Sequence, residues 1–270
     1  MVVQHNMAAS NANRQLGIST NVLSKSTEKL SSGYRINRAA DDAAGLSISE
    51  KMRSQIRGLN KASSNAQDGI SAIQTAEGAL NEAHSILQRM NELATQAAND
   101  TNTTTDRKAV QSEIDALTKE ISRIASTTQF NTQNLLDGKF TGKNLQVGAL
   151  NGQSISISIK TMNAGALSVN ALDVKSFKAA GSAMNKIQAA IDKVSTQRSN
   201  LGALQNRLEH TVNNLDNVAE NTQTAESRIR DTDMASEMVQ YSATSIIQQA
   251  GQSMLAQANS QTQGVLSLIQ

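Results

Sequence analysis

A chain of 270 residues could bury a large core, yet aromatic residues make up only 2% of it, and it contains no Trp, Pro or Cys. A globular enzyme usually has more aromatic residues to bury, so the composition argues against that class. The 25 basic and 23 acidic residues are interspersed and leave a formal net charge of +2, so no basic region indicates a nucleic-acid partner. Abundant Ala, Ser, Gln, Asn and Leu without proline predict a mainly α fold, an elongated antiparallel helical bundle with coiled-coil terminal arms.

The first predicted helix carries a narrow apolar stripe. Apolar residues recur every seven positions, and small residues follow three positions later (Val2, Ala9, Leu16, Leu23 and Leu30; Ala12, Ser19 and Ser26). A helix of about 30 residues with so thin a stripe gains too little from burial to be stable alone. We therefore expect residues 1–40 to form an arm that pairs with another helix or with neighbouring molecules.

Residues 27–59 interrupt one helical pattern and start another. The Ser-Ser-Gly sequence that ends at Gly33 lowers helix propensity, and glycine readily adopts a left-handed conformation. Asp41 and Asp42 lie where acidic groups favour a following helix start. Because adjacent side chains diverge, we interpret these carboxylates as helix-start groups and not as a catalytic pair.

From residue 47 to residue 98, apolar and small residues alternate at steps of four and three, which predicts the longest helix. The polar run 99–105 indicates a turn, and a second stripe over 110–124 should fold back antiparallel. Residues 129–136 look like an irregular linker. Isoleucines then alternate with serines over 154–159 beyond an Asn-Gly pair, which predicts one small β-hairpin near 144–160.

The same helical rhythm returns in residues 177–232, which should complete the bundle begun by residues 41–176. Residues 233–270 form a second arm whose apolar face carries only Glu237 as a charge after Asp233. An apolar face of this kind on a terminal helix usually marks an assembly surface. The candidate assembly residues of the two arms are Leu16, Leu23, Leu30, Ile246, Ile247, Met254, Val265, Leu268 and Ile269.

Both ends of the chain resemble bacterial flagellins, in residues 29–57 near one end and in residues 197–210, 225–235 and 254–259 near the other. The resemblance implies a structural subunit that polymerises with itself into the flagellar filament for motility, here without the outer domains inserted in many relatives. It also implies an extracellular protein exported by the flagellar secretion apparatus, and partners that include an export chaperone, hook-junction proteins and cap proteins.

Two sequence observations accompany this expectation of export. The first residues lack the basic flank and apolar block of a cleaved signal peptide. No run of about 18 apolar residues could span a bilayer, so we expect no membrane insertion.

A surface patch is similar to the one by which Toll-like receptor 5 recognises flagellins. The resemblance implies that Arg89 is its central anchor and Leu93 an apolar companion, with Gln88 beside them and Glu113 contributing from the returning helix. Arg89 and Leu93 are four residues apart, so they share one helical face. Without the resemblance, the same residues would be interpreted as a solvated helix face.

Two rival functions remain at this stage. A hook-filament junction protein would have similar terminal helices but would join unlike partners. A secreted hydrolase on a helical scaffold is disfavoured, because the sequence shows no catalytic constellation, and the three histidines lie far from any metal-ligand spacing (His5, His84 and His210). We therefore expect neither an enzyme nor a cofactor.

Overall fold

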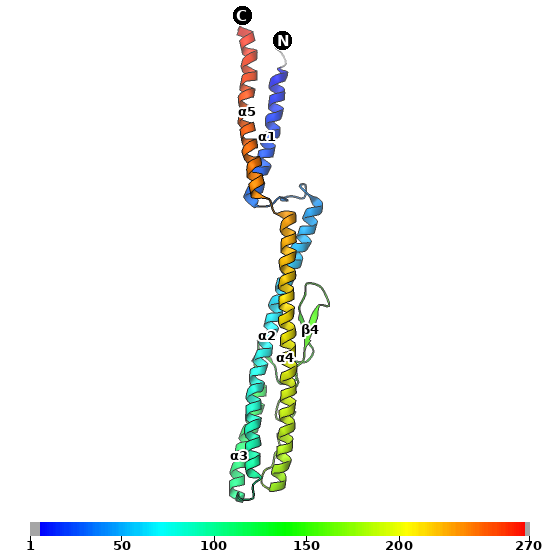
Figure 1. Ribbon diagram of the computed structural model, residues 1–270, viewed down its shortest axis with the longest axis vertical. Coiled ribbons are helices and arrows are strands. Elements are labelled where there is room, and N and C mark those ends of the chain that lie inside the picture. The colour runs from blue at the N-terminus through cyan, green and yellow to red at the C-terminus, as the bar shows by residue number, and fades with distance from the viewer. Residues whose placement is uncertain (1–5, 268–270) are drawn as a thin grey trace. The chain divides into compact units, whose positions relative to one another are not determined.

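The computed structural model describes residues 6–267, with the backbone alone described for 262, 263 and 265–267. Five helices dominate the described part of the chain (Figure 1): α1 Met7–Ser32, α2 Ala43–Ala97, α3 Thr104–Thr127, α4 Phe177–Arg230 and α5 Met234–Ser267. Four short strands complete it: β1 Gln129–Phe130, β2 Gln133–Asn134, β3 Lys143–Gln146 and β4 Ser154–Ile157. The predicted mainly α class is confirmed.

The chain divides into two compact units, one of Met1–Ser54 with Asn221–Gln270 and the other of Gln55–Glu220. The first unit joins both ends of the chain. In it, α1 and α5 lie side by side and run antiparallel (Figure 1). The second unit contains most of α2 and α4 together with α3 and all four strands.

The core of the second unit lies where α2, α3 and α4 meet. Its fully buried side chains include Ile73, Leu80, Leu87, Ile114, Ile121, Ile187, Val194 and Leu201. The buried stripe of α2 is wider than the predicted one, because α2 is covered by both α3 and α4. The additional buried apolar residues of α2 are Ala62, Ala72, Ala76, Ala83, Met90, Leu93 and Ala97. Most of them are alanines, whose small side chains occupy little of the core.

The predicted hairpin is confirmed as β3–β4, with Leu145 opposite Ile155. Gly152 adopts a φ of +86° in the turn, as the Asn-Gly pair predicts. The hairpin packs on α2 at two glycines that leave room for it. A Cβ at Gly58 would lie 2.9 Å from the Cβ of Ala149, and a Cβ at Gly69 would clash with Leu145.

A second hairpin, β1–β2, lies in the segment that the sequence predicted as an irregular linker. Its two-residue turn places Asn131 and Thr132 at φ values of +46° and +63°. Such a turn usually carries glycine, and a β-branched residue with positive φ is rare, so the turn chemistry gave no signal for it. The end of this segment is anchored in the core, since Leu135 and Leu136 are buried.

Residues 158–174 cross the bundle without regular structure and fill its core. Their buried side chains are Ile159, Met162, Ala164, Leu167, Val169, Leu172 and Val174. Gln111 of α3, itself buried, fixes the end of this segment: its Nε2 donates to the carbonyl of Leu172 over 2.8 Å, and its Oε1 accepts from the N–H of Val174 over 2.9 Å.

Residues 33–42 separate α1 from α2 as expected. Gly33 ends α1 in a left-handed conformation, with φ +76°, and donates its N–H to the carbonyl of Lys29. Asp42 accepts a hydrogen bond from the N–H of Gly45 over 2.8 Å at the start of α2. Asp41 accepts from the backbone N–H groups of Arg38 and Asn37, which lowers the pKa of its carboxyl group.

Candidate assembly surface and receptor-binding patch

The terminal helices α1 and α5 contact each other through a heptad seam. On α1, Leu16, Leu23 and Leu30 are half-buried in this seam, and Ser26 is buried. On α5 most of the half-buried or buried positions also follow steps of four and three, but they are mostly polar or small: Glu237, Tyr241, Thr244, Gln248, Gly251, Leu255 and Ala258, with Ser245 beside them. The seam therefore buries little apolar area on the α5 side.

Polar contacts set the register of this pair. The Nδ2 of Asn6 donates to the carbonyl of Ala258 over 2.9 Å at one end. At the other end, the Nζ of Lys29 lies 3.4 Å from the Oε2 of Glu237. Glu237 is the only charged residue within α5, and it faces α1, so the opposite face of α5 carries no charge.

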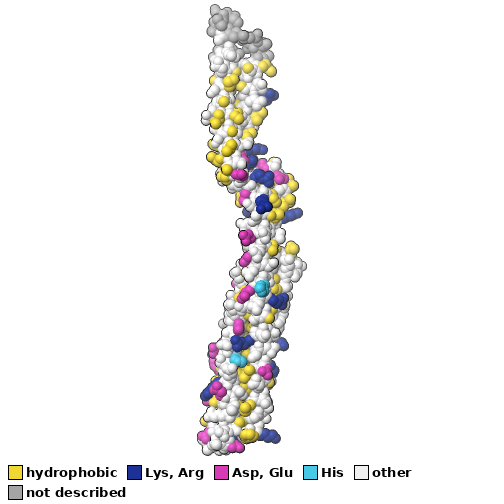
Figure 2. All heavy atoms as spheres, viewed as in Figure 1, with side chains coloured by type: hydrophobic (Ala, Val, Ile, Leu, Met, Phe, Trp, Pro, Cys, Tyr) yellow, Lys and Arg dark blue, Asp and Glu magenta, His cyan; other side chains and the backbone are white. Residues whose placement is uncertain are grey.

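Apart from Leu255, the large aliphatic residues of α5 whose side chains are described lie outside the seam with α1. Ile246, Ile247 and Met254 are 66%, 57% and 64% exposed, and Met238 and Val239 are also exposed. Figure 2 shows hydrophobic side chains gathered over the α1 and α5 pair. We call Met238, Val239, Ala243, Ile246, Ile247, Ala250 and Met254 the outer face of α5. An uncharged apolar face of this size is unusual on a soluble monomer.

The structure thus divides the candidate assembly residues into two groups. Leu16, Leu23 and Leu30 lie in the α1–α5 seam, whereas Ile246, Ile247 and Met254 lie on the outer face. Of the remaining candidates, the side chain of Val265 and the whole of Leu268 and Ile269 lie outside the described residues. The sequence prediction omitted two exposed residues of α1, Met7 and Ile18, which are eleven positions apart and therefore share a face.

The start of α5 is fixed by a carboxylate. Asp233 accepts hydrogen bonds from the N–H groups of Ala235 and Ser236 and from the hydroxyl of Ser236. These bonds lower the pKa of Asp233 because they stabilise its charged form. The helix start therefore keeps its cap at neutral pH.

Arg230 ties the end of α4 to the start of α2 within the first unit. Its Nη1 lies 2.6 Å from the Oε1 of Glu50, and its guanidinium carbon lies 4.8 Å from the centre of the Tyr34 ring. The backbone adds two bonds, from Arg35 N–H to the Arg230 carbonyl and from Thr232 N–H to the Gly33 carbonyl. These contacts hold residues 33–35, which follow α1, against residues 230–232, which precede α5.

In the second unit, Arg89 forms the centre of an exposed ion-pair cluster. Its Nε and Nη2 donate to the Oε1 of Glu113 over 3.1 and 3.0 Å, and its Nη1 donates to the Oε2 of Glu92 over 3.2 Å. The bonds to Glu113, and then those to Glu92, raise the pKa of Arg89. Gln88 is exposed beside it and contacts His84. Arg89, Gln88 and Glu113 thus form one surface, which we call the Arg89 patch.

Leu93 does not share this surface. Its side chain is 2% exposed and belongs to the hydrophobic core. Although it is four residues from Arg89, its side chain packs into the core of the second unit. Helical spacing gives the angle between two side chains but does not say which of them a neighbouring helix buries. Leu93 therefore belongs to the core that holds α2 in place and not to the Arg89 patch itself.

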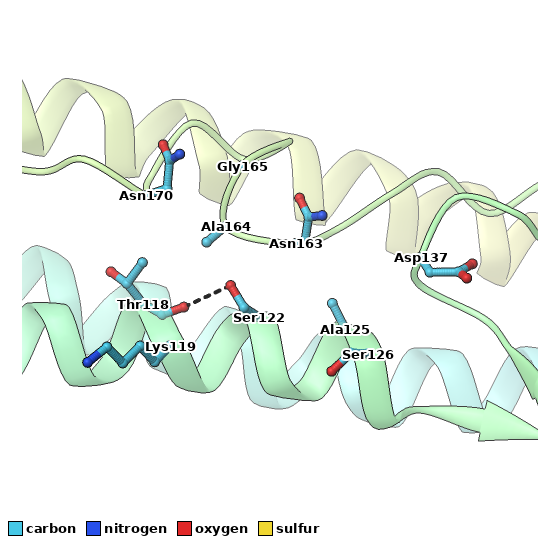
Figure 3. A pocket seen from close by; sticks show the side chains of 10 residues that line it. All are labelled: Thr118, Lys119, Ser122, Ala125, Ser126, Asp137, Asn163, Ala164, Gly165 and Asn170. Carbon is cyan, nitrogen blue, oxygen red and sulfur yellow. Dashed lines mark hydrogen bonds between the residues drawn. The ribbon is translucent and has the colours of Figure 1, made fainter.

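A surface cavity of about 500 Å³ lies between α3 and the crossing segment (Figure 3). Two of its polar side chains have partners within the protein: the Ser122 hydroxyl donates to the Thr118 carbonyl, and Asn163 accepts from the Ala166 N–H. Lys119 and Asp137 are its only ionisable lining residues. Among the described residues, no three His, Cys, Asp or Glu side chains are grouped to hold a metal ion, and no helix is long and apolar enough to cross a membrane.

Comparisons with known proteins identify the family. The bacterial flagellin N-terminal helical region matches residues 3–141, and the bacterial flagellin C-terminal helical region matches residues 184–269. Flagellin of Halalkalibacterium halodurans is 56% identical over 271 residues, and flagellin of Bacillus subtilis is 51% identical over 304 residues. Both alignments cover 100% of this chain and 100% of the relative.

Solved structures agree with this assignment. The crystal structure of Bacillus cereus flagellin is 33% identical, with a TM-score of 0.50, and covers 56% of this chain and 88% of that chain. A putative flagellar hook-associated protein from Vibrio parahaemolyticus has a TM-score of 0.60 over 71% of this chain and 100% of its own, but at 13% identity this likeness shows the fold alone. The chain belongs to the bacterial flagellin family, whose members are structural proteins of the flagellar filament and not enzymes.

Proposed function

We propose that this flagellin adds to the growing filament through the outer face of α5. In this proposal, residues 1–40 and 233–270 act as filament-core arms, and residues 41–176 and 177–232 are the two halves of the bundle. The observation that carries the proposal is the orientation of α5, which packs its polar side on α1 and exposes its apolar side. Its polar and small residues pack on α1, and Ile246, Ile247 and Met254 are left in solvent.

Assembly of this kind is open-ended. When one surface of a subunit contacts a different surface of the next, the contacts repeat without closing and generate a helical filament. Burial of the outer face of α5 would supply the driving force. The weak α1–α5 seam allows the pair to adjust to its neighbours.

The other expected partners would also bind the terminal helices. An exposed apolar face needs cover before assembly, which is consistent with an export chaperone on α5. Hook-junction and cap proteins would contact the same arms at the two ends of the filament. We propose an extracellular location, reached through the flagellar secretion apparatus.

The first experiment is electron microscopy of the purified protein after addition of short filament seeds. We expect long uniform filaments from the full chain and none from a chain that lacks residues 235–270, which should stay monomeric and helical by circular dichroism. A full chain that only caps the seeds would instead identify a hook-filament junction protein. A truncated chain that still polymerised would remove α5 from the assembly mechanism.

We also propose that Toll-like receptor 5 recognises the Arg89 patch. Arg89 and Glu113 have 52% and 46% of their side-chain surface exposed, and Gln88 is exposed beside them. A paired arginine on a rigid helix is a suitable anchor, because its position is fixed before binding and it retains donors for a partner. The buried Leu93 holds the helix in place and would not contact the receptor directly.

Substitution Arg89→Asp should weaken receptor binding roughly tenfold or more, the range of a central interface arginine. The matched control is Arg123→Asp, since Arg123 is also an exposed helical arginine paired with a glutamate, Glu120. Surface plasmon resonance with the receptor ectodomain would measure both affinities, and circular dichroism would verify the fold. Equal affinities for the Arg89 variant and the unmodified protein would remove the patch from the proposal.

A further inference from the structure

The methionines of this chain are unevenly protected. Of those the structure describes, Met90 and Met162 are 0% and 5% exposed in the core of the second unit. Met52 and Met184 are half-buried. The exposed ones all belong to the first unit, where Met7 lies on α1, and Met234, Met238 and Met254 lie on α5.

Two of these, Met238 and Met254, belong to the outer face of α5. They are 49% and 64% exposed and stand beside Val239 and Ile247 in a surface without charge. A thioether at such a position is accessible to hydroperoxides, whereas the same group in a packed core is not. Oxidation also changes the chemistry of the face, because methionine sulfoxide is polar and methionine is not.

We propose that Met238 and Met254 are modification sites, at which oxidation by hydrogen peroxide prevents the unassembled subunit from joining the filament. In the reaction, the thioether sulfur attacks one peroxide oxygen, the O–O bond breaks, and an S=O bond forms. The sulfur loses two electrons, and the peroxide leaves as water. The inference rests on the proposed assembly role of α5, because only a face that becomes buried is harmed by a polar oxygen.

The expected effect follows from desolvation. Burying a polar group without a hydrogen-bond partner disfavours the buried state by about tenfold or more for each group. Met238 and Met254 are sixteen residues apart, so their sulfoxides lie on different sides of the exposed half of α5 and act independently. Together they should raise the subunit concentration needed for elongation by roughly a hundredfold. Subunits already in a filament should react more slowly, since assembly covers both sulfur atoms.

The test exposes purified monomer to hydrogen peroxide, removes the peroxide with catalase, and measures elongation of filament seeds. Peptide mass spectrometry locates the added oxygen atoms. The variant Met238→Leu with Met254→Leu keeps the apolar area but has no sulfur at these positions, and Met90→Leu with Met162→Leu is the matched control at buried positions. Each variant is compared with its own untreated sample. We expect peroxide to stop elongation by the unmodified protein and by the control, and to leave the Met238 and Met254 variant at its own untreated rate.

Each outcome of this experiment either supports or overturns the proposal. Equal loss of elongation in the Met238 and Met254 variant would overturn the proposal, and so would unchanged elongation by protein with oxygen mapped to both residues. Recovery after treatment with methionine sulfoxide reductases and a thiol would support it. Failure of the untreated protein to extend seeds would instead reject the assembly role of α5 itself.

Discussion

Replacing Ile246 and Ile247 by serine should raise the subunit concentration needed for filament elongation roughly a hundredfold. Each isoleucine contributes about 1.5–3 kcal/mol when it moves from water into an apolar contact, and about 1.4 kcal/mol is a factor of ten. Both side chains are more than half exposed in the subunit, at 66% and 57%, so more than half of this energy is available to assembly. Elongation of seeds, followed by light scattering and electron microscopy, measures the change.

The same substitutions should leave the subunit folded, because neither side chain lies in the α1–α5 seam. Circular dichroism should show unchanged helix content. The matched control is Leu150→Ser with Phe177→Ser, which removes two similarly exposed apolar side chains from the second unit, 68% and 61% exposed. Should the control variant lose assembly to the same degree, general loss of exposed apolar area, and not the outer face of α5, would explain the result.

Replacing Gln111 by alanine should destabilise the second unit by about 2–4 kcal/mol. Gln111 donates to the Leu172 carbonyl and to Asp115, and accepts from the Val174 N–H. Without the amide, two backbone groups in an apolar region lose their partners, and each costs about 1–3 kcal/mol. Urea unfolding followed by circular dichroism measures the difference.

Two further variants separate hydrogen bonding from packing at this position. Gln111→Met keeps the volume but not the amide, so it should lose most of the same stability. Gln188→Ala removes an amide that only contacts Asp192 on the exposed side of α4, and it should change stability by less than about 0.5 kcal/mol. If Gln111→Met unfolded at the urea concentration of the unmodified protein, the amide would be unimportant.

The sequence predicted most helices correctly because their apolar periods are long and uninterrupted. The heptad Leu16, Leu23 and Leu30 does face α5, and the Ser-Ser-Gly sequence at Gly33 does end α1. On α5, however, the regularly spaced apolar residues are exposed to solvent, since polar residues such as Thr244 and Gln248 occupy the seam with α1. Hydrophobic pattern locates an apolar face but does not say whether its partner is in the same chain.

Other features depend on contacts that no local pattern contains. Spacing alone placed Leu93 with Arg89 on the Arg89 patch, but the side chain of Leu93 is buried in the core. The crossing segment 158–174 lacks a regular period, and its apolar residues are fixed through Gln111, more than 60 residues earlier in the chain. Exposure of Met238 and Met254 could be recognised only after the orientation of α5 was known.

Both units bring together parts of the chain that are far apart in sequence. The Ser63 hydroxyl donates to Asp216 across 153 residues in the second unit, and Asn6 donates to the Ala258 carbonyl across 252 residues in the first. Such long-range contacts have a large loop-closure entropy and slow folding relative to bundles of local helical hairpins. A chain without its last third can therefore complete neither unit, and folding of each subunit must wait for its carboxyl-terminal helices.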